Sequence, residues 1–165
     1  MAIKNPKALK LAQIILSKVG VCDFWKLLKL MYFIDFESYY VTEKPVTENV
    51  YVHLIYGPIP DQYKLDIIQK GIEMELWEVT GEHSLILKNS ETIENIKLDK
   101  LDETFVDLIL QKYGNLTGKQ LVSLSHDDPP WYLTEPNEKI DFELVKWRDS
   151  EITKSEDITD KVMNV

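Results

Sequence analysis

The stretch SLSHDDPPW, residues 123–131, gathers more residues capable of chemistry than any other part of this sequence. His126 is followed directly by Asp127 and Asp128. A carboxylate that fixes an imidazole is the element shared by general-base sites and metal sites. Side chains of adjacent residues rarely contact each other, however, so the spacing alone gives weak support for catalysis.

A structural interpretation of the same stretch competes with the chemical one. Ser125 and Asp128 are residue types that satisfy free backbone groups at the end of a helix. Pro129 and Pro130 disfavour helical backbone in the residues before them, so we expect an extended exit from that helix. On this interpretation His126 closes a corner against Trp131, which packs back onto the core.

The remaining candidates for chemistry are weaker. His53 lies in a predicted strand, where we expect it on the polar side, and His83 lies in a predicted turn. Neither has the spacing of a zinc motif, and Cys22 is interpreted as a small buried hydrophobic residue. There is no G-x-S-x-G sequence and no glycine-rich phosphate loop. We therefore predict no catalytic residue, no metal and no cofactor.

The charge of the chain argues against nucleic acid as a partner. Twenty-eight acidic and nineteen basic residues give a net charge of −9, and phosphate binding relies on basic groups. Residues 1–30 are the exception, with six lysines and one acid. We interpret these lysines as the solvated sides of two amphipathic helices.

The sequence predicts a cytoplasmic protein that does not enter a membrane. Its single cysteine fits a reducing compartment, because it cannot form an internal disulfide. The first residues lack the apolar core of a secretion signal, and no window reaches the roughly 18 apolar residues of a membrane span. Oligomeric state stays open.

Apolar spacing predicts a mainly α (α+β) fold built around a buried central helix. That helix follows Asp23 as its N-cap, and its apolar residues occupy more than one face, which is typical of a helix covered on all sides. The other predicted helices begin after Asn5, at Pro60, near Leu101 and after Thr117. The second of these is expected to span residues 61–70 and to end at Gly71.

Two extended regions complete the predicted fold. Residues 50–56 suit a short strand, which the sequence Gly57-Pro58-Ile59-Pro60 is expected to break. Residues 74–79 and 84–88 flank a turn and predict a β-hairpin. We expect one domain over residues 1–148 and an acidic, mobile tail over residues 149–165.

Four short blocks, taken together in this order, resemble one known family. They are KLMYFID (residues 29–35), KPVT (44–47), YGPIP with Tyr63 (56–63), and LSH with PW (124–131). Their order and spacing are similar to those of the Panacea domain of SocA-like antitoxins, which also occur as phage-associated proteins. We call these four segments the signature blocks.

The resemblance implies a mostly helical domain that neutralises a cognate protein toxin by binding it, without catalysis. Carried over by position, the residues of interest are interpreted as holding a shared scaffold and a common binding groove. They are Tyr32, Tyr56, Gly57, Pro58, Pro60, His126 and Trp131. The two chain ends, the hairpin at 74–88 and the linker at 89–100 lie outside the signature blocks, and we expect toxin choice to be set there.

Three alternatives to simple neutralisation stay open at this point. The protein would be an adaptor that hands a bound toxin to a protease, or a DNA-binding autoregulator that uses its basic N-terminal helices. The buried character of the central helix argues against the latter, because a recognition helix needs a polar face. The least favoured alternative is a hydrolase that uses His126 with Asp127 or Asp128.

Overall fold

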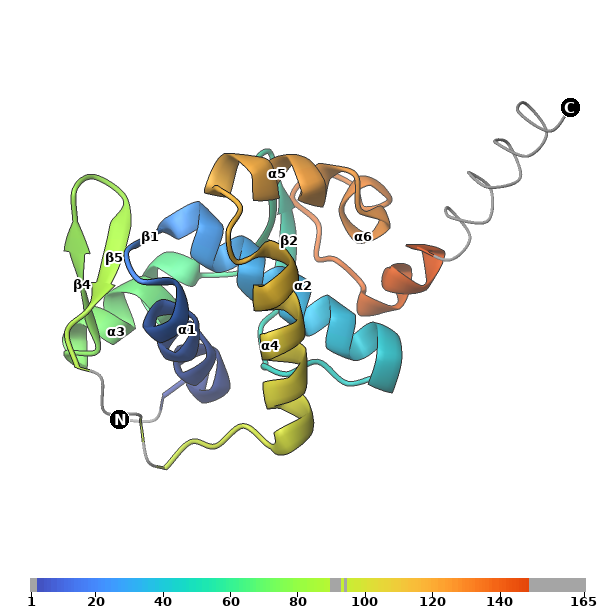
Figure 1. Cartoon of the computed structure of the whole chain (residues 1–165). Helices are drawn as coiled ribbons and strands as arrows, with labels where there is room; N and C mark the ends of the chain where they lie inside the picture. Colours follow the sequence, from blue (N-terminus) through green and yellow to red (C-terminus); the bar gives the residue numbers. More distant parts are fainter. Residues whose placement is uncertain (1–2, 90–92, 94, 149–165) are drawn as a thin grey trace, which may run out of the picture.

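The computed structural model describes residues 3–89, 93 and 95–148 and has a mainly helical fold with two small antiparallel sheets (Figure 1). This confirms the predicted fold class. The segment 149–165, predicted to be an acidic tail, lies outside the described residues. The elements are α1 (Pro6–Val19), β1 (Cys22–Asp23), α2 (Phe24–Thr42), β2 (Tyr51–Leu54), β3 (Gly57–Pro60), η1 (Lys64–Gln69), α3 (Lys70–Glu73), β4 (Trp77–Thr80), β5 (Ser84–Leu87), α4 (Lys100–Tyr113), α5 (Gly118–His126), α6 (Pro129–Tyr132) and η2 (Phe142–Lys146).

Helix α2 is the centre of the domain, as its sequence predicts. Asp23 caps it, because one carboxylate oxygen accepts a hydrogen bond from the backbone N–H of Lys26 at 2.9 Å. Every residue from Leu27 to Phe36 is buried. Helices α1, α4 and α5 pack around it together with β3 and η2 (Figure 1). The apolar stripe that a surface helix shows is replaced here by burial around the whole helix.

The segment Gly57–Pro60 forms a strand of its own, so its predicted role as a mere break is wrong. It pairs antiparallel with β2, in the register Leu54 opposite Gly57 and Tyr51 opposite Pro60. A proline lacks the N–H that a central strand needs, but a strand at the edge of a sheet tolerates it. The chain therefore reverses at Ile55 and Tyr56 rather than at the prolines.

The helix after β3 differs from its predicted form at both ends. Pro60 ends the strand instead of starting a helix, and a π-helical segment, η1, begins at Lys64 and continues into α3. Gly71 lies inside α3 rather than after it. A Cβ at this position would overlap the indole ring of Trp77, which is only 1% exposed. The glycine is therefore explained by close packing rather than by helix termination.

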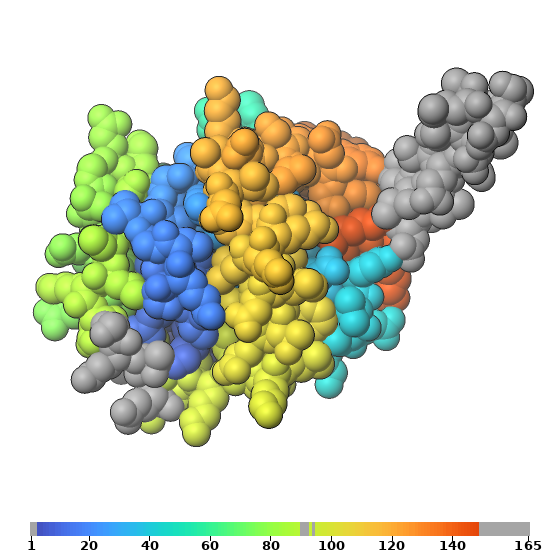
Figure 2. Space-filling view, in the orientation of Figure 1, coloured from blue at the N-terminus to red at the C-terminus, as the bar shows by residue number. Residues whose placement is uncertain are grey.

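The predicted β-hairpin is present and belongs to a three-stranded sheet. Strands β4 and β5 pair antiparallel, and β5 also pairs with the two-residue strand β1, in the order β1-β5-β4. The hairpin projects from one side of the molecule next to α1 (Figure 2). Strand β4 is thus an edge strand, and its Trp77 ties the hairpin to α3.

Helix α5 ends at His126, close to the predicted end, but the predicted extended exit is limited to Asp128. Residues 129–132 form the short helix α6, in which Pro129 and Pro130 occupy the first turn. Proline is favourable there, because the N–H groups of a first turn have no partner within the helix. Asp128 stands at the cap position, and its side chain does not cap α6 but points elsewhere, as described below. Likewise, Ser125 donates within its own helix, to Val122.

Within the described residues, no helix has both the length and the apolar character needed to cross a membrane.

We predict that Gly71→Ala destabilises the protein although alanine favours helices. The added methyl group must displace the buried ring of Trp77, and such overpacking costs about 1–3 kcal/mol. Urea unfolding followed by tryptophan fluorescence measures the change. Gln69→Ala, at an exposed position of the neighbouring η1, is the control and should change stability by less than about 0.5 kcal/mol. Equal stability of Gly71→Ala and the wild type would contradict the packing explanation.

Candidate functional site

Three polar side chains on the buried helix α2 connect it to the segments around it. They are Lys29, Tyr32 and Asp35, which are 0% exposed and spaced three residues apart. This spacing places them along one side of the helix. A buried polar group is costly unless it is hydrogen-bonded, so each of the three requires a partner from another part of the chain. All three belong to the first signature block, and each finds its partner in a different one.

Lys29 connects α2 to the β2–β3 hairpin. Its Nζ donates a hydrogen bond to the carbonyl oxygen of Pro58 at 3.1 Å. Gly57 has a φ of +107°, and a Cβ at this position would lie 2.8 Å from the Cε of Lys29 and 2.5 Å from the Oγ of Ser125. Glycine is therefore required both by the backbone conformation and by the close approach of these side chains. Burial lowers the pKa of Lys29 to about 7.

Tyr32 connects α2 to the segment that follows α5. Its hydroxyl donates to Asp128 at 2.6 Å, and Arg148 donates to both carboxylate oxygens of Asp128 at 2.7 Å. A third hydrogen bond runs from Arg148 to Glu37 at 3.1 Å. Burial and the neighbouring Asp128 carboxylate raise the pKa of Tyr32 well above its usual value, so the phenol stays protonated. These four residues are called the Arg148 cluster.

Asp35 fixes the segment between α2 and β2. It accepts hydrogen bonds from the N–H and the hydroxyl of Thr47 at 2.7 and 2.6 Å, and from the Tyr51 hydroxyl at 2.7 Å. Burial raises the pKa of Asp35 to about 6, although these donors act in the opposite direction. The KPVT block is thereby explained as the partner of a buried carboxylate.

The ring of Trp131 is stacked between two histidines. The ring of His53 lies on one side and that of His126 on the other, each with a centroid distance of 4.2 Å. The indole N–H donates to the carbonyl oxygen of Leu54 at 2.9 Å. His53 Nδ1 lies 2.8 Å from the Trp131 carbonyl oxygen, and His126 Nε2 lies 3.1 Å from that of Ile55. The stack therefore fastens the β2–β3 hairpin to α5 and α6.

The structure thus separates the histidine and the carboxylates that are adjacent in sequence. His126 is directed to Ile55 and Trp131, whereas Asp128 is directed to Tyr32 and Arg148. Asp127 is exposed. The general-base arrangement that first drew attention to SLSHDDPPW is therefore not assembled in this structure.

Of the seven sequence-predicted positions, Tyr32, Gly57, Pro58 and Pro60 are buried, while His126 and Trp131 are partly exposed. Tyr56 is 56% exposed at the turn of the hairpin, and its ring contacts that of Trp25 at 5.4 Å between centroids. The seven come together around one hairpin and the helices against which it packs. A direct role of any of them in partner binding stays a prediction.

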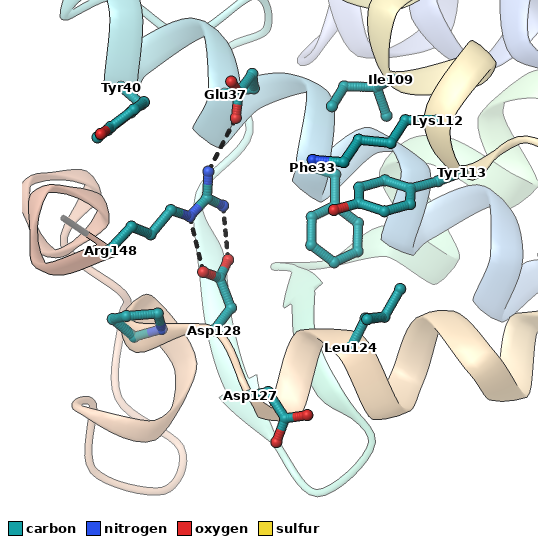
Figure 3. A pocket seen from close by; sticks show the side chains of 11 residues that line it. Phe33, Glu37, Tyr40, Ile109, Lys112, Tyr113, Leu124, Asp127, Asp128 and Arg148 are labelled. Atoms are coloured by element: carbon teal, nitrogen blue, oxygen red, sulfur yellow. Dashed lines mark hydrogen bonds and ion pairs between the residues drawn. The ribbon is translucent and has the colours of Figure 1, made fainter. Parts of the chain in front are cut away.

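Glu37, Asp128 and Arg148 of the Arg148 cluster form one wall of an open pocket of about 370 Å³ (Figure 3). The opposite wall is largely apolar and comes from α2, α4 and α5, through Phe33, Ile109, Tyr113 and Leu124. The figure shows the guanidinium of Arg148 lying between Asp128 and Glu37. Its hydrogen-bond donors are therefore directed to internal carboxylates rather than into the open space, and the arrangement joins the chain around η2 to the core.

Metal-ligating side chains and basic residues are the groups on which metal or nucleic-acid binding would depend. No group of three or more histidine, cysteine, aspartate or glutamate residues in this part of the chain is arranged to hold a metal ion. Several of the N-terminal lysines have internal partners: Lys29 is buried, Lys10 donates to Ile93, and Lys18 pairs with Asp107. Such lysines offer few free charges for phosphate contacts.

Sequence reasoning missed two contributors to this site. Arg148 lies outside the signature blocks, and nothing in its neighbourhood predicts a contact with a residue 20 positions earlier. His53 was expected on the polar side of its strand, yet it stacks on Trp131. Two signals in the sequence indicate that such partners are needed: an aspartate, Asp128, directly before two prolines, and polar residues such as Tyr32 within the buried part of α2.

Comparison with known proteins gives one family. The family model described as "Antitoxin SocA-like, Panacea domain" matches residues 27–132. No curated protein and no solved structure matches. The matched segment contains Lys29, Tyr32 and Asp35 together with their partners Pro58, Asp128 and Thr47, so the contacts that connect the signature blocks all lie within it.

We predict that stability rises between pH 7 and pH 9 because of Lys29. Its folded pKa, about 7, lies below the unfolded value of 10.5, so the unfolded chain binds more protons in this interval. This difference contributes about 2 kcal/mol to the rise in the free energy of unfolding. Urea unfolding of the wild type and of Lys29→Met at both pH values isolates the contribution. A pH slope that is the same in both proteins would refute it.

Loss of Arg148 should leave the carboxylate of Asp128 buried and without its cation. We expect Arg148→Ala to destabilise the protein by roughly 3 kcal/mol, and Asp128→Asn in the same chain to restore part of that loss. Thermal and urea unfolding of both single variants and the double variant provide the measurement. Lys146→Ala removes nearby exposed ion pairs to Glu43 and Glu143 and should leave stability almost unchanged. A similarly small effect for Arg148→Ala would contradict the proposed role of the cluster.

Proposed function

Because the chain belongs to the family of SocA-like antitoxins with a Panacea domain, we propose that it is the antitoxin of a toxin–antitoxin pair. In this proposal it neutralises a cognate protein toxin by direct binding in the cytoplasm. The family match over residues 27–132 is the observation that carries the proposal. Binding requires no catalytic group and no cofactor.

The contacts of the signature blocks support a binding role over an enzymatic one. Lys29, Tyr32 and Asp35 are used to hold neighbouring segments, and His126 is engaged with backbone and a tryptophan ring. The polar residues of the signature blocks therefore build a rigid scaffold. A rigid scaffold reduces the entropy that is lost when a partner binds.

The proposal predicts that the protein rescues growth from the toxin encoded by the neighbouring open reading frame. Both genes are placed under separate inducible promoters, so that control of their native promoter cannot account for rescue. We also expect the two proteins to co-purify as a stable complex with an interface near the standard area of about 1,600 Å². Absence of both rescue and complex would refute the proposal.

The same experiment separates direct neutralisation from delivery to a protease. In a host that lacks the main cytoplasmic proteases, a directly neutralised toxin stays inactive and accumulates in the complex. An adaptor, by contrast, loses its protective effect in that host. Toxin levels measured by immunoblot, with and without the antitoxin, distinguish the two.

A further inference from the structure

A second surface, remote from the Arg148 cluster, has the features of a docking groove. It lies between the start of α2, the segment η1–α3 and the β4–β5 hairpin, and has a volume of about 570 Å³. This volume falls within the range of roughly 300–1,000 Å³ that is typical of binding pockets. Its apolar lining consists of Phe24, Trp25, Tyr63, Ile68, Ile72 and Val79. We call this surface the hairpin groove.

The hairpin groove exposes more apolar surface than its own fold requires. Val79 faces the groove from the edge strand β4 and is 43% exposed. The aromatic lining continues outward, because the ring of Trp25 lies 6.3 Å from that of Tyr63 and 5.4 Å from that of Tyr56. Beyond Tyr56, Ile55 at the hairpin turn is 78% exposed. Contiguous apolar surface of this kind marks an interaction site more often than scattered exposed residues do.

The walls of the groove are fixed before any partner arrives. The N–H of Phe24 donates to the carbonyl oxygen of His83 at 2.7 Å, and the two rings meet edge to face. This contact joins the start of α2 to the tip of the hairpin. Large aromatic side chains that are already positioned lose little conformational entropy on binding and are enriched among the residues that dominate interface energies.

Backbone geometry gives a separate indication for the same wall. The segment η1, which contributes Lys64 and Ile68, is a π-helix, and Gln62 just before it has a φ of +58°. π-helical turns are rare and occur frequently at functional sites, and left-handed backbone at a residue other than glycine is costly. The π-helical turn itself forms part of the groove wall, and Gln62 directly precedes the lining residues Tyr63 and Lys64.

Charge indicates which kind of occupant fits. Residues 70–88, which include the hairpin, carry four glutamates and two lysines. The lysines pair with Glu73 and Glu75, whereas Glu78 and Glu82 have no ion pair among the residues that the structure describes. Glu82 lines the groove on the hairpin side, and Lys64 lines it on the η1 side, with its Nζ 6.0 Å from the centroid of the Tyr63 ring. A second copy of the chain, which also carries a net charge of −9, would add repulsion, so a basic partner is favoured.

We propose that the hairpin groove binds an amphipathic segment of the cognate toxin. Apolar side chains of that segment fill the space between Trp25, Tyr63 and Val79, and its basic side chains approach Glu82. This inference rests on the proposed antitoxin function and adds to it the surface and the chemistry of the partner. The hairpin lies outside the signature blocks, in one of the regions where the sequence analysis expects toxin choice to be set.

The test compares groove variants with a control on another face, using the full chain and the toxin that it neutralises. Val79→Asp, Tyr63→Ala and Glu82→Lys should each weaken toxin binding at least about tenfold in calorimetry. Leu108→Asp, at an exposed site on α4, should bind within about twofold of the wild type. Circular dichroism and thermal unfolding verify that every variant is folded.

A second measurement probes the groove without the toxin. A synthetic amphipathic peptide of leucine and lysine, followed by NMR, should shift the amide signals of residues around Tyr63 and Val79 saturably. A matching peptide of leucine and glutamate should cause no such shifts. In the Val79→Asp variant, the leucine–lysine peptide should cause none either.

Each outcome decides between defined alternatives. Folded groove variants that bind toxin like the wild type would overturn the inference and leave the antitoxin function intact. A concentration-dependent dimer that Val79→Asp dissociates would assign the groove to a second copy and also overturn it. If the leucine–lysine peptide binds but the chain neutralises no toxin, that result refutes both the toxin as the occupant of the groove and the proposed antitoxin function.

Discussion

The burial of α2 on all sides is the constraint on which the rest of this structure depends. Apolar residues alone would let the surrounding segments slide, because the hydrophobic effect has no direction. Lys29, Tyr32 and Asp35 remove that freedom, since each is satisfied only when one particular segment is in one position. The four signature blocks are therefore a set of mutual hydrogen-bond requirements rather than four independent motifs.

The buried contacts of α2 and the hairpin groove use different parts of the chain. Lys29, Tyr32 and Asp35 hold the segments on either side of β2, together with α5 and α6. The β4–β5 hairpin attaches through Trp77, the short strand β1, α1 and the start of α2. Substitutions at the hairpin surface therefore leave the hydrogen bonds of Lys29, Tyr32 and Asp35 undisturbed. In the proposed binding mode, recognition and stability are carried by different residues.

The sequence predicts correctly those helices and strands that are determined by residues close together in the chain. Apolar spacing and capping residues gave α1, α2, α4 and α5, and the turn at 80–83 gave the β4–β5 hairpin. The predictions were wrong where a contact with another element determines the backbone. Gly57–Pro60 forms a strand because it pairs with β2 and accepts a hydrogen bond from Lys29. Gly71 is a glycine because the ring of Trp77 packs against it. The stack on Trp131 and the ion pair of Arg148 join residues 78 and 20 positions apart, beyond the reach of any local pattern.

The prolines of β3 have a consequence for how a strand edge can lie inside the domain. All four residues of β3 are buried, and the strand packs against α2 and α5. A buried backbone N–H without a partner is costly, and Pro58 and Pro60 have no N–H. The carbonyl oxygen of Pro58, which does need a partner, accepts a hydrogen bond from Lys29. The YGPIP block therefore lets helices cover the edge of a two-stranded sheet without leaving these backbone groups unsatisfied.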